Sequence, residues 1–361
     1  MRKLRAGVLA ATGAVGQNYV HLLRDHPWFE ITFLAASKDS KSFEEAVSAR
    51  GWFMGQDIPA DVRKLRVFEA SNLEAALDGC DFVFSALDKD VAKDLEMKYA
   101  KAGLPVVSNA SAYRGDPFVP MLMPEINADH IRVIPAQQRR YGFKDGFIVV
   151  KPNCSLQSYM KPIHALMAAG YNVDRLIVHT QQAASGAGRP GVSALDLIDN
   201  VVPFISGEEE KSEREPLKIL GSVDNDKGIV DYEGLAISAT CTRVPVRDGH
   251  LASVNISFRG KKPSADQIRL AWALYRREPQ ELGLLFAPDQ PIIYRDEPNR
   301  PQPVLDRDSG NGMAVTAGRL RECPVFDYKF VCLSHNTVRG AAGGGILNAE
   351  LLYAKDCLKP R

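Results

Sequence analysis

Cys154 stands where a predicted strand turns into a predicted helix. The apolar run GFIVV precedes the segment KPNCS, and the segment that follows, LQSYMKPIHALMAAG, has its apolar residues at helical spacing. A cysteine in the first turn of a helix lies among unpaired backbone N–H groups at the positive end of the helix dipole, and both stabilise a thiolate. An inert buried thiol is the alternative. Asn153 and Ser155, two polar neighbours at a core edge, favour a nucleophilic cysteine.

A second group of reactive side chains lies in ISATCTRVPVRDGHLASV. The first strand of this segment ends at Arg243, and the turn VRDG delivers His250 to the start of the next strand. Histidine is the side chain best suited to move a proton at neutral pH, and arginine offers a planar fork for a carboxylate or phosphate. A surface histidine and an arginine in a structural ion pair are the alternatives.

Glycine residues occupy the turn between the first predicted strand and the first predicted helix, AATGAVG. Gly13 and Gly16 would let the backbone approach a phosphate, and the free N–H groups at the helix start favour an anion. Such a turn predicts dinucleotide binding only if the context agrees, since many glycine-bearing turns bind nothing.

The second predicted strand ends in ASKDSK, where dinucleotide-binding domains select their cofactor. Asp39 would suit the ribose 2′-hydroxyl of NAD, or it points to solvent. Basic and hydroxyl groups suit the 2′-phosphate of NADP, and these are Ser37, Lys38 and Ser40. We favour NADP, with NAD as a possible substitute.

These candidate residues have to be positioned by two kinds of domain. The first half alternates short apolar runs with helical patterns, which is the βαβ signature of a parallel sheet. The second half has longer strand-like runs and a charged segment, 207–220, that could be a solvated helix, whereas 297–312 reads as a loop. The fold class is therefore α/β: a Rossmann-like dinucleotide-binding domain (1–153, completed by a returning helix in 340–361) and an α+β domain (154–339).

Composition excludes several classes of protein. The chain has 361 residues, 45% of them hydrophobic, which is enough for two cored domains. Lysine plus arginine (45) balance aspartate plus glutamate (44), so no nucleic-acid partner is expected and a small molecule is favoured. No apolar run approaches the ~20 residues of a membrane span, and the N-terminus lacks a convincing signal peptide, so we expect a cytoplasmic protein without a membrane partner. The six cysteines lack zinc-ligand spacing, and no metal site is predicted.

Seven motifs occur in order along the chain: GAVG, SNASAYR followed by VPMLMPEIN, KPNCS, TQQAASGAG, GEEEK, SATCTRVPVRDGH and HNTVRGAAGGGILNAE. Together they resemble the aspartate-β-semialdehyde dehydrogenases, in particular the branch found in archaea and fungi. The resemblance implies a Rossmann-like NADP domain and a catalytic α+β domain that also forms the interface of a homodimer or homotetramer. It implies NADPH-dependent conversion of L-4-aspartyl phosphate to L-aspartate-4-semialdehyde, a step in the biosynthesis of lysine, threonine, methionine and isoleucine.

The resemblance also implies roles for individual residues. Cys154 matches the nucleophile, His250 the acid/base, and Gln181 the group that holds the thioester carbonyl or the substrate. The substrate-binding positions are Arg243 for the α-carboxylate, Glu210 for the amino group, and Lys211, Arg114 and Asn153 for the acyl phosphate or inorganic phosphate. The cofactor positions are Thr12, Gly13, Ala14, Val15, Ser37, Lys38, Ser40, Ser85, Ser185, Gly186, Gly188 and Asn336.

Two positions depart from the family pattern GATGxVG and its phosphate loop. Ala10 stands where the first glycine is expected, and a methyl group there would cost of order 1 kcal/mol if the position needs φ > 0. Lys38 and Asp39 stand where the family offers Arg and Ser.

Two other functions are compatible with the scaffold: an acyl-CoA reductase such as malonyl-CoA reductase, and a non-catalytic NADP-binding paralogue. The intact EEEK and RVPVRDGH segments favour an amino-acid substrate.

Overall fold

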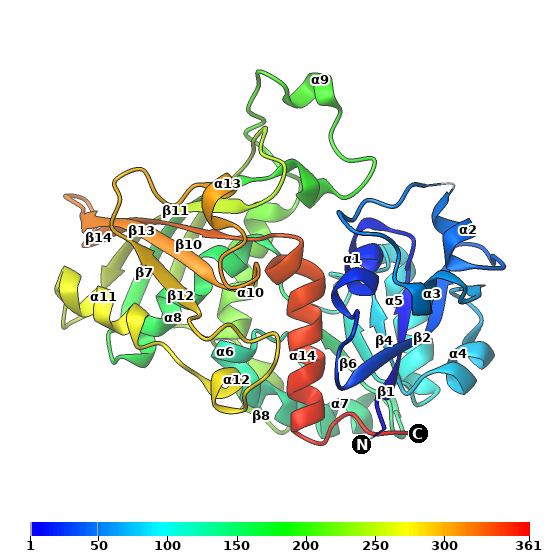
Figure 1. The fold of residues 1–361 in the computed structure, drawn as a ribbon. Coiled ribbons are helices and arrows are strands. Elements are labelled where there is room, and N and C mark those ends of the chain that lie inside the picture. Colours follow the sequence, from blue (N-terminus) through cyan, green and yellow to red (C-terminus); the bar gives the residue numbers. More distant parts are fainter. Residues whose placement is uncertain (1, 49) are drawn as a thin grey trace.

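The computed structural model describes residues 2–48 and 50–361 and divides most strands between two large sheets (Figure 1). The first sheet is parallel throughout, and its order is β3-β2-β1-β4-β5-β6. Its strands are β1 (Leu4–Leu9), β2 (Phe29–Ala36), β3 (Val67–Glu69), β4 (Phe82–Ser85), β5 (Val106–Ser108) and β6 (Ile148–Val150). This order places the topological switch point between β1 and β4, where α/β sheets bind ligands. The Rossmann-like prediction is confirmed.

Helices and short turns connect these strands. They are α1 (Ala14–Leu22), α2 (Phe43–Ser48), α3 (Ala60–Arg63), α4 (Leu73–Gly79), α5 (Lys89–Lys101), α6 (Pro124–Asn127), the 3₁₀ turn η1 (Ala128–Val133) and α7 (Ile134–Tyr141). Local sequence explains several of their ends. Asn72 caps α4 by accepting from the Ala75 N–H, and Gly142 ends α7 with φ 67°.

The second sheet is mixed, in the order β10-β7-β11-β14-β13-β12. Its strands are β7 (Val173–Gln182), β10 (Ala236–Arg243), β11 (His250–Phe258), β12 (Ile292–Arg295), β13 (Val315–Glu322) and β14 (Tyr328–Ser334). A separate hairpin joins β8 (Ser222–Asp224) to β9 (Gly228–Val230). Along β7, buried residues alternate with more exposed ones, as expected of a sheet with one packed face. This confirms the α+β prediction.

Helices and turns of the second half follow the Cys154 segment. They are η2 (Ser155–Ser158), α8 (Met160–Ala168), η3 (Ala184–Ala187), α9 (Ala194–Leu197), α10 (Glu208–Ile219), α11 (Ala265–Ala273), α12 (Glu278–Glu281) and α13 (Pro303–Asp306). The charged segment 207–220 is a helix, as predicted, but it is not a solvated one, because one face that includes Glu208, Ser212 and Glu215 is buried. The predicted loop 297–312 contains α13, a single turn that begins with Pro303 and is held by Asp306, whose carboxylate accepts from the Gln302 N–H at 2.6 Å.

The last helix, α14 (Gly343–Ala354), follows the π-helical turn η4 (Val338–Ala342) and stands between the two sheets (Figure 1). It contacts α1 and β5 of the first domain, and most of its residues are buried. The domain boundaries, with 340–361 assigned to the first domain and the division at residue 153, stay a prediction.

Apolar side chains from both sheets share one core. Ile148 of the first sheet, Leu156 of η2, and Val178 and Val254 of the second sheet are all buried in the same cluster. The segment 151–158 leads from the first sheet towards the second, and it is almost entirely buried in this closely packed core. Within the described ranges, no helix has the length and apolar character needed to cross a membrane.

Candidate active site at Cys154

The sequence predicted one helix after Cys154. The structure instead has the 3₁₀ turn η2 followed by the helix α8. Asn153 shapes this turn. Its side-chain oxygen accepts from the backbone N–H and from the hydroxyl of Ser155, both at 2.8 Å. Its own backbone N–H donates to Glu215 Oε2 at 2.6 Å. These bonds satisfy donors at the start of η2, and the helical run is interrupted at Tyr159, whose φ is −120° and which separates η2 from α8.

Cys154 and His250 face each other, with 3.3 Å between Sγ and Nε2. The backbone N–H of Ala183 donates to His250 Nδ1 at 3.0 Å. Because Nδ1 accepts this bond, the proton of the neutral imidazole lies on Nε2 and points at the sulfur. Burial, reinforced by the charge of Arg243, lowers the pKa of His250 to about 3, so the ring stays neutral.

The electrostatic environment of the thiol differs from the sequence-based expectation. Burial raises the pKa of Cys154, and the Glu208 carboxylate adds to this rise, whereas Lys151 and Arg114 lower the pKa. The helix-start effect expected from the sequence is outweighed because the sulfur is desolvated. The thiolate has to be stabilised by particular neighbouring charges.

Two glycines allow this close arrangement. A Cβ on Gly186 would lie 2.8 Å from Arg243 Nη1 and 3.0 Å from His250 Cε1. A Cβ on Gly340 would lie 2.8 Å from Cys154 Cβ. Either methyl group would displace the reacting groups, so glycine here is a packing requirement.

Helix α10 contributes one face to the site, and the residue it contributes is Glu208 rather than the predicted Glu210. Glu208 accepts from Asn153 Nδ2 at 2.8 Å, Gln182 Nε2 at 3.1 Å and Lys211 Nζ at 2.9 Å. Glu210 is exposed. In an α-helix, residues three, four and seven apart share a face, which groups Glu208 with Lys211, Ser212 and Glu215 and turns Glu210 away.

The structure also places Gln182, and not the predicted Gln181, beside Glu208. Gln182 is buried and bonds Glu208, whereas Gln181 is only partly buried and lies on the other face of β7. Successive strand residues point to opposite faces, so the step of one residue decides which glutamine reaches the site. The alternation along β7 and the i,i+3 spacing of Glu208 and Lys211 were the sequence signals for these two residues.

Two arginines bring positive charge to the site. Arg243 is buried, and its Nη1 donates to Ala183 O at 2.7 Å, which leaves other guanidinium donors for a ligand. Arg114 donates to Glu215 Oε1 at 3.0 Å and to Asn109 O at 2.9 Å, and its buried Nε has no partner. A fork with unused donors suits a carboxylate or phosphate. Both predicted substrate-binding arginines thus lie in the cluster around Cys154.

The turn after β1 has the features of a phosphate-binding turn. Helix α1 starts after Gly13, and no side chain caps it. A Cβ on Gly16 would lie 2.2 Å from Ala10 O, so strand and helix pack in contact at this point. The Gly13 N–H donates to Ala10 O at 3.0 Å, so the N–H groups of the first helical turn, those of Ala14, Val15 and Gly16 after Thr12, remain for an anion.

Ala10 adopts φ 58°, the left-handed conformation that the departure from the glycine pattern raised as a concern. We expect Ala10→Gly to stabilise the protein by about 0.5–1 kcal/mol, because the Cβ strain disappears at a small entropic cost. Denaturant unfolding measures this change. The matched control is Ala11→Gly, since Ala11 is buried and does not have a positive φ; it should be destabilised. Equal destabilisation of both variants would contradict the strain argument.

The loop after β2 favours the 2′-phosphate over a free ribose. Asp39 Oδ1 accepts from the Glu69 N–H at 2.6 Å, and Oδ2 lies 3.7 Å from Arg66 Nη2. The carboxylate that would select NAD is therefore held by the neighbouring strand β3 and the residue before it. Ser37 and Lys38 are exposed, and Ser40 donates to Glu45 Oε2 at 3.1 Å.

The remaining cofactor candidates lie near the carboxyl edge of the first sheet and at the domain junction. Asn109 Oδ1 is buried without a partner directly after β5, as a polar atom that awaits a ligand would be, whereas the hydroxyl of Ser85 at the end of β4 lies beside the Glu96 carboxyl and helps to lower its pKa against the rise caused by burial. Asn336 Nδ2 donates to Ser185 Oγ, and its Oδ1 accepts from the Gly249 N–H, both at 2.8 Å. Asn336 thus ties the 185–188 turn, which contains Gly186 and Gly188, to the residue before His250. These donors and acceptors fit a dinucleotide.

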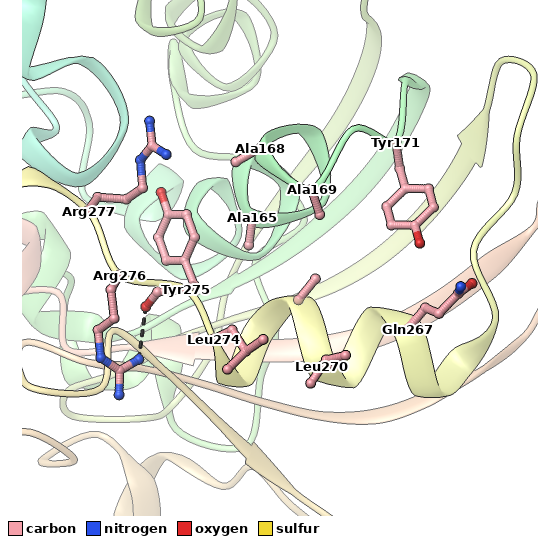
Figure 2. A pocket seen from close by; sticks show the side chains of 11 residues that line it. Ala165, Ala168, Ala169, Tyr171, Gln267, Leu270, Leu274, Tyr275, Arg276 and Arg277 are labelled. Atoms are coloured by element: carbon pink, nitrogen blue, oxygen red, sulfur yellow. Dashed lines mark hydrogen bonds between the residues drawn. The ribbon is translucent and has the colours of Figure 1, made fainter.

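The groove in Figure 2 is not part of this site. It lies between α8 and α11, and its lining includes Ala165, Leu270 and Leu274 but no cysteine or histidine. In the part of the chain that the structure describes, no three His, Cys, Asp or Glu side chains gather in a way that could hold a metal ion. The reactive groups are concentrated around Cys154.

Comparisons with known proteins cover both domains. Residues 5–134 match the family model "Semialdehyde dehydrogenase, NAD binding domain", and residues 161–339 match "Semialdehyde dehydrogenase, dimerisation domain". The aspartate-semialdehyde dehydrogenase of Cryptococcus neoformans is 45% identical over 99% of each chain, and that of Methanothermobacter thermautotrophicus is 46% identical over 97% of this chain and 99% of its own. The crystal structure of the Candida albicans aspartate semialdehyde dehydrogenase with NADP has a TM-score of 0.89 and 42% identity, covering 98% of this chain and 99% of its own.

Proposed function

Since the chain belongs to the semialdehyde dehydrogenase family, in the branch that includes fungal and archaeal members, we propose that it is an aspartate-semialdehyde dehydrogenase. In the biosynthetic direction it reduces L-4-aspartyl phosphate to L-aspartate-4-semialdehyde and releases inorganic phosphate. The observation that carries this proposal is the contact of Cys154 with His250 beside two arginines with unused donors.

The first half of the reaction is acyl transfer to sulfur. The Cys154 thiolate attacks the acyl carbon, the bond to the phosphate oxygen breaks, and a thioester forms. Arg243 is placed to hold the α-carboxylate, and Glu208 to hold the amino group. Arg114 and Lys211 offer positive charge to the departing phosphate. Asn153 acts indirectly, because its bonds hold the turn that carries the nucleophile.

The second half is reduction of the thioester. NADPH, when bound, supplies the hydride. As negative charge develops on the former carbonyl oxygen, the Nε2–H of His250 can donate a hydrogen bond that stabilises it; the carbonyl then re-forms as the carbon–sulfur bond breaks, which gives the aldehyde and the thiolate. The Nε2 tautomer is the form this step requires, and the Ala183 N–H maintains it.

NADP is the cofactor of this proposal. The first domain matches an NAD-binding family model, and the bonded carboxylate of Asp39 leaves Ser37 and Lys38 to meet a 2′-phosphate. The Candida albicans relative was solved with NADP.

The experiment that tests the function is reduction of NADP by aspartate semialdehyde with and without inorganic phosphate, run beside NAD. We expect phosphate-dependent turnover with NADP preferred. Malonyl-CoA with NADPH is the parallel arm. Turnover only in that arm would replace the proposal with an acyl-CoA reductase, and silence in both arms would support a binding paralogue.

The corrected assignment of the glutamate makes a separate prediction. We expect Glu208→Gln to lower kcat/KM for aspartate semialdehyde by about 10²-fold, because it weakens the bonds that place Asn153 and Lys211 and removes the charge that meets the amino group. Glu210→Gln is the matched control, two residues away on the exposed face, and should change kcat/KM by less than about twofold. A larger loss of kcat/KM with Glu210→Gln than with Glu208→Gln would instead assign the contact with the amino group to Glu210.

The match to a dimerisation domain supports self-association, and we propose that the enzyme is a homodimer or homotetramer. The long connection around α9 projects from the second domain (Figure 1). Its apolar side chains are unusually exposed, including Leu195 at 89% and Phe204 at 64%, as expected of a surface that a second copy covers. Analytical ultracentrifugation separates the two states.

We also propose a cytoplasmic location, because all six cysteines are free and Cys154 must stay reduced.

A further inference from the structure

Phe53 and Arg189, from the two halves of the chain, stack against each other, and none of the roles above uses them. The guanidinium carbon of Arg189 lies 3.5 Å from the centre of the Phe53 ring. Both side chains are exposed. A guanidinium over the face of an aromatic ring is attracted by the ring quadrupole, so this contact draws the two segments together.

Phe53 is tied to the phosphate-binding turn through Gln17 of α1, a fully buried side chain. Gln17 Nε2 donates to Thr12 O at 3.0 Å and to Gly51 O at 2.9 Å, and its Oε1 accepts from the Phe53 N–H at 2.9 Å. One side-chain amide thus bonds the backbone of both segments. The turn after β1 and the loop 51–53 therefore form one hydrogen-bonded unit.

Gly51 contributes to the placement of the aromatic ring. It adopts φ 86°, and a Cβ at this position would lie 2.9 Å from Phe53 Cε1. Glycine both reaches this conformation without strain and leaves room for the ring. The loop therefore presents Phe53 in a position that another residue at 51 would disturb.

Arg189 directly follows the turn 185–188, which is fixed to the catalytic side of the site. Asn336 bonds both Ser185 Oγ and the Gly249 N–H, each at 2.8 Å. The Ser185 N–H donates to Arg247 O at 3.1 Å. The guanidinium therefore extends from a turn that is bonded to the segment immediately before the catalytic histidine.

We propose that Phe53 and Arg189 form a clasp across the dinucleotide site and act as positioning residues for NADP. The clasp joins the phosphate-binding turn, reached through Gln17, to the turn 185–188, and these are the two segments that supply cofactor candidates from opposite halves of the chain. Holding both segments in place before the cofactor arrives reduces the ordering that binding requires. The proposal rests on the NADP site of the proposed function and is independent of the acyl substrate.

The test is the dissociation constant of NADPH, measured by its fluorescence on the full chain without substrate. The variants are Phe53→Leu, Arg189→Gln and the double variant. We expect each single variant to raise Kd by about 2–5-fold, the contribution of an exposed cation–π pair. Because the two side chains act through each other, the double variant should raise Kd by about as much as one single variant, not by the product of the two.

Two further measurements separate positioning from other roles. The kcat at saturating NADP and phosphate should stay within about twofold in all three variants, whereas a part in the chemistry would lower it. The matched control is Arg140→Gln, which removes another exposed guanidinium, 4.5 Å from the centre of the Phe118 ring on α7's side of the first domain, and should leave Kd unchanged.

The remaining outcomes overturn the clasp. A raised Kd with Arg189→Gln but not with Phe53→Leu would make Arg189 a direct partner of a cofactor phosphate. Unchanged Kd in both single variants, multiplied effects in the double variant, or the same rise with Arg140→Gln would also contradict it. A wild-type protein that binds no NADPH would remove the cofactor of the proposed function together with the clasp, whereas normal wild-type binding with unaffected variants removes the clasp alone.

Discussion

Replacing Cys154 by serine is expected to lower kcat for phosphate-dependent oxidation of aspartate semialdehyde by about 10⁴-fold or more. The hydroxyl fits the space of the thiol, but it is a far weaker acid than a thiol, and His250 presents its N–H rather than a lone pair to this position. Steady-state NADPH formation measures the loss. Unfolding temperature should change little, since the serine stays packed against Gly340.

The control for this variant is Cys323→Ser. Cys323 is a partly buried cysteine near the end of β13, far along the chain from the site, and its replacement should leave turnover unchanged. Substantial activity in Cys154→Ser would contradict the covalent mechanism. Loss of activity in both variants would point to a general sensitivity of the fold rather than to a nucleophile.

A buried ion network holds the two sides of the active site together, and it carries the second large prediction. Arg339 of η4 donates to Glu125 of α6 through Nη1 at 2.9 Å and Nη2 at 2.6 Å, and through Nε to Gln157 of η2 at 2.8 Å. Lys161 of α8 adds a bond to Glu125 Oε1 at 3.4 Å. The network therefore clamps the turn after Cys154 to the residue before Gly340.

Replacing Glu125 by glutamine is expected to destabilise the protein by about 3–5 kcal/mol, because two buried cations lose their counter-charge. Denaturant unfolding at neutral pH measures this. The exposed Glu44, 3.9 Å from Arg63, provides the control: Glu44→Gln should change stability by less than about 0.5 kcal/mol.

The same network fixes the sign of a pH dependence. Despite burial, which acts in the opposite direction, Arg339 and Lys161 lower the pKa of Glu125 to about 2 from an ordinary 4.5. A carboxylate with a depressed pKa stabilises the folded state above the unfolded pKa and loses this contribution as pH falls. The stability gap between wild type and Glu125→Gln should thus narrow from pH 4.5 towards pH 2. If the difference in unfolding free energy between wild type and Glu125→Gln does not change with pH, the charge of Glu125 does not contribute and only its packing does.

Sequence patterns were sufficient for the architecture. The alternation of apolar runs and helical segments predicted the parallel sheet, since burial on both faces requires such runs. Motif order was sufficient to predict the family, and with it Arg114 as a candidate. Residue type and position alone identified Cys154, His250 and Arg243, because few side chains can perform acyl transfer or bind a carboxylate.

Tertiary structure decided what depends on direction and distance. The face of β7 that packs inward decides that Gln182 rather than Gln181 reaches the site. In the same way, the inward face of α10 selects Glu208 rather than Glu210, and a shift of one or two residues would select the other side chain. The tautomer of His250 depends on the Ala183 N–H, far away in sequence. The ionisation of Cys154 depends on burial and on charges from several elements, Lys151 among them, and only the folded chain brings these within range because electrostatic interactions act through space, not along the sequence.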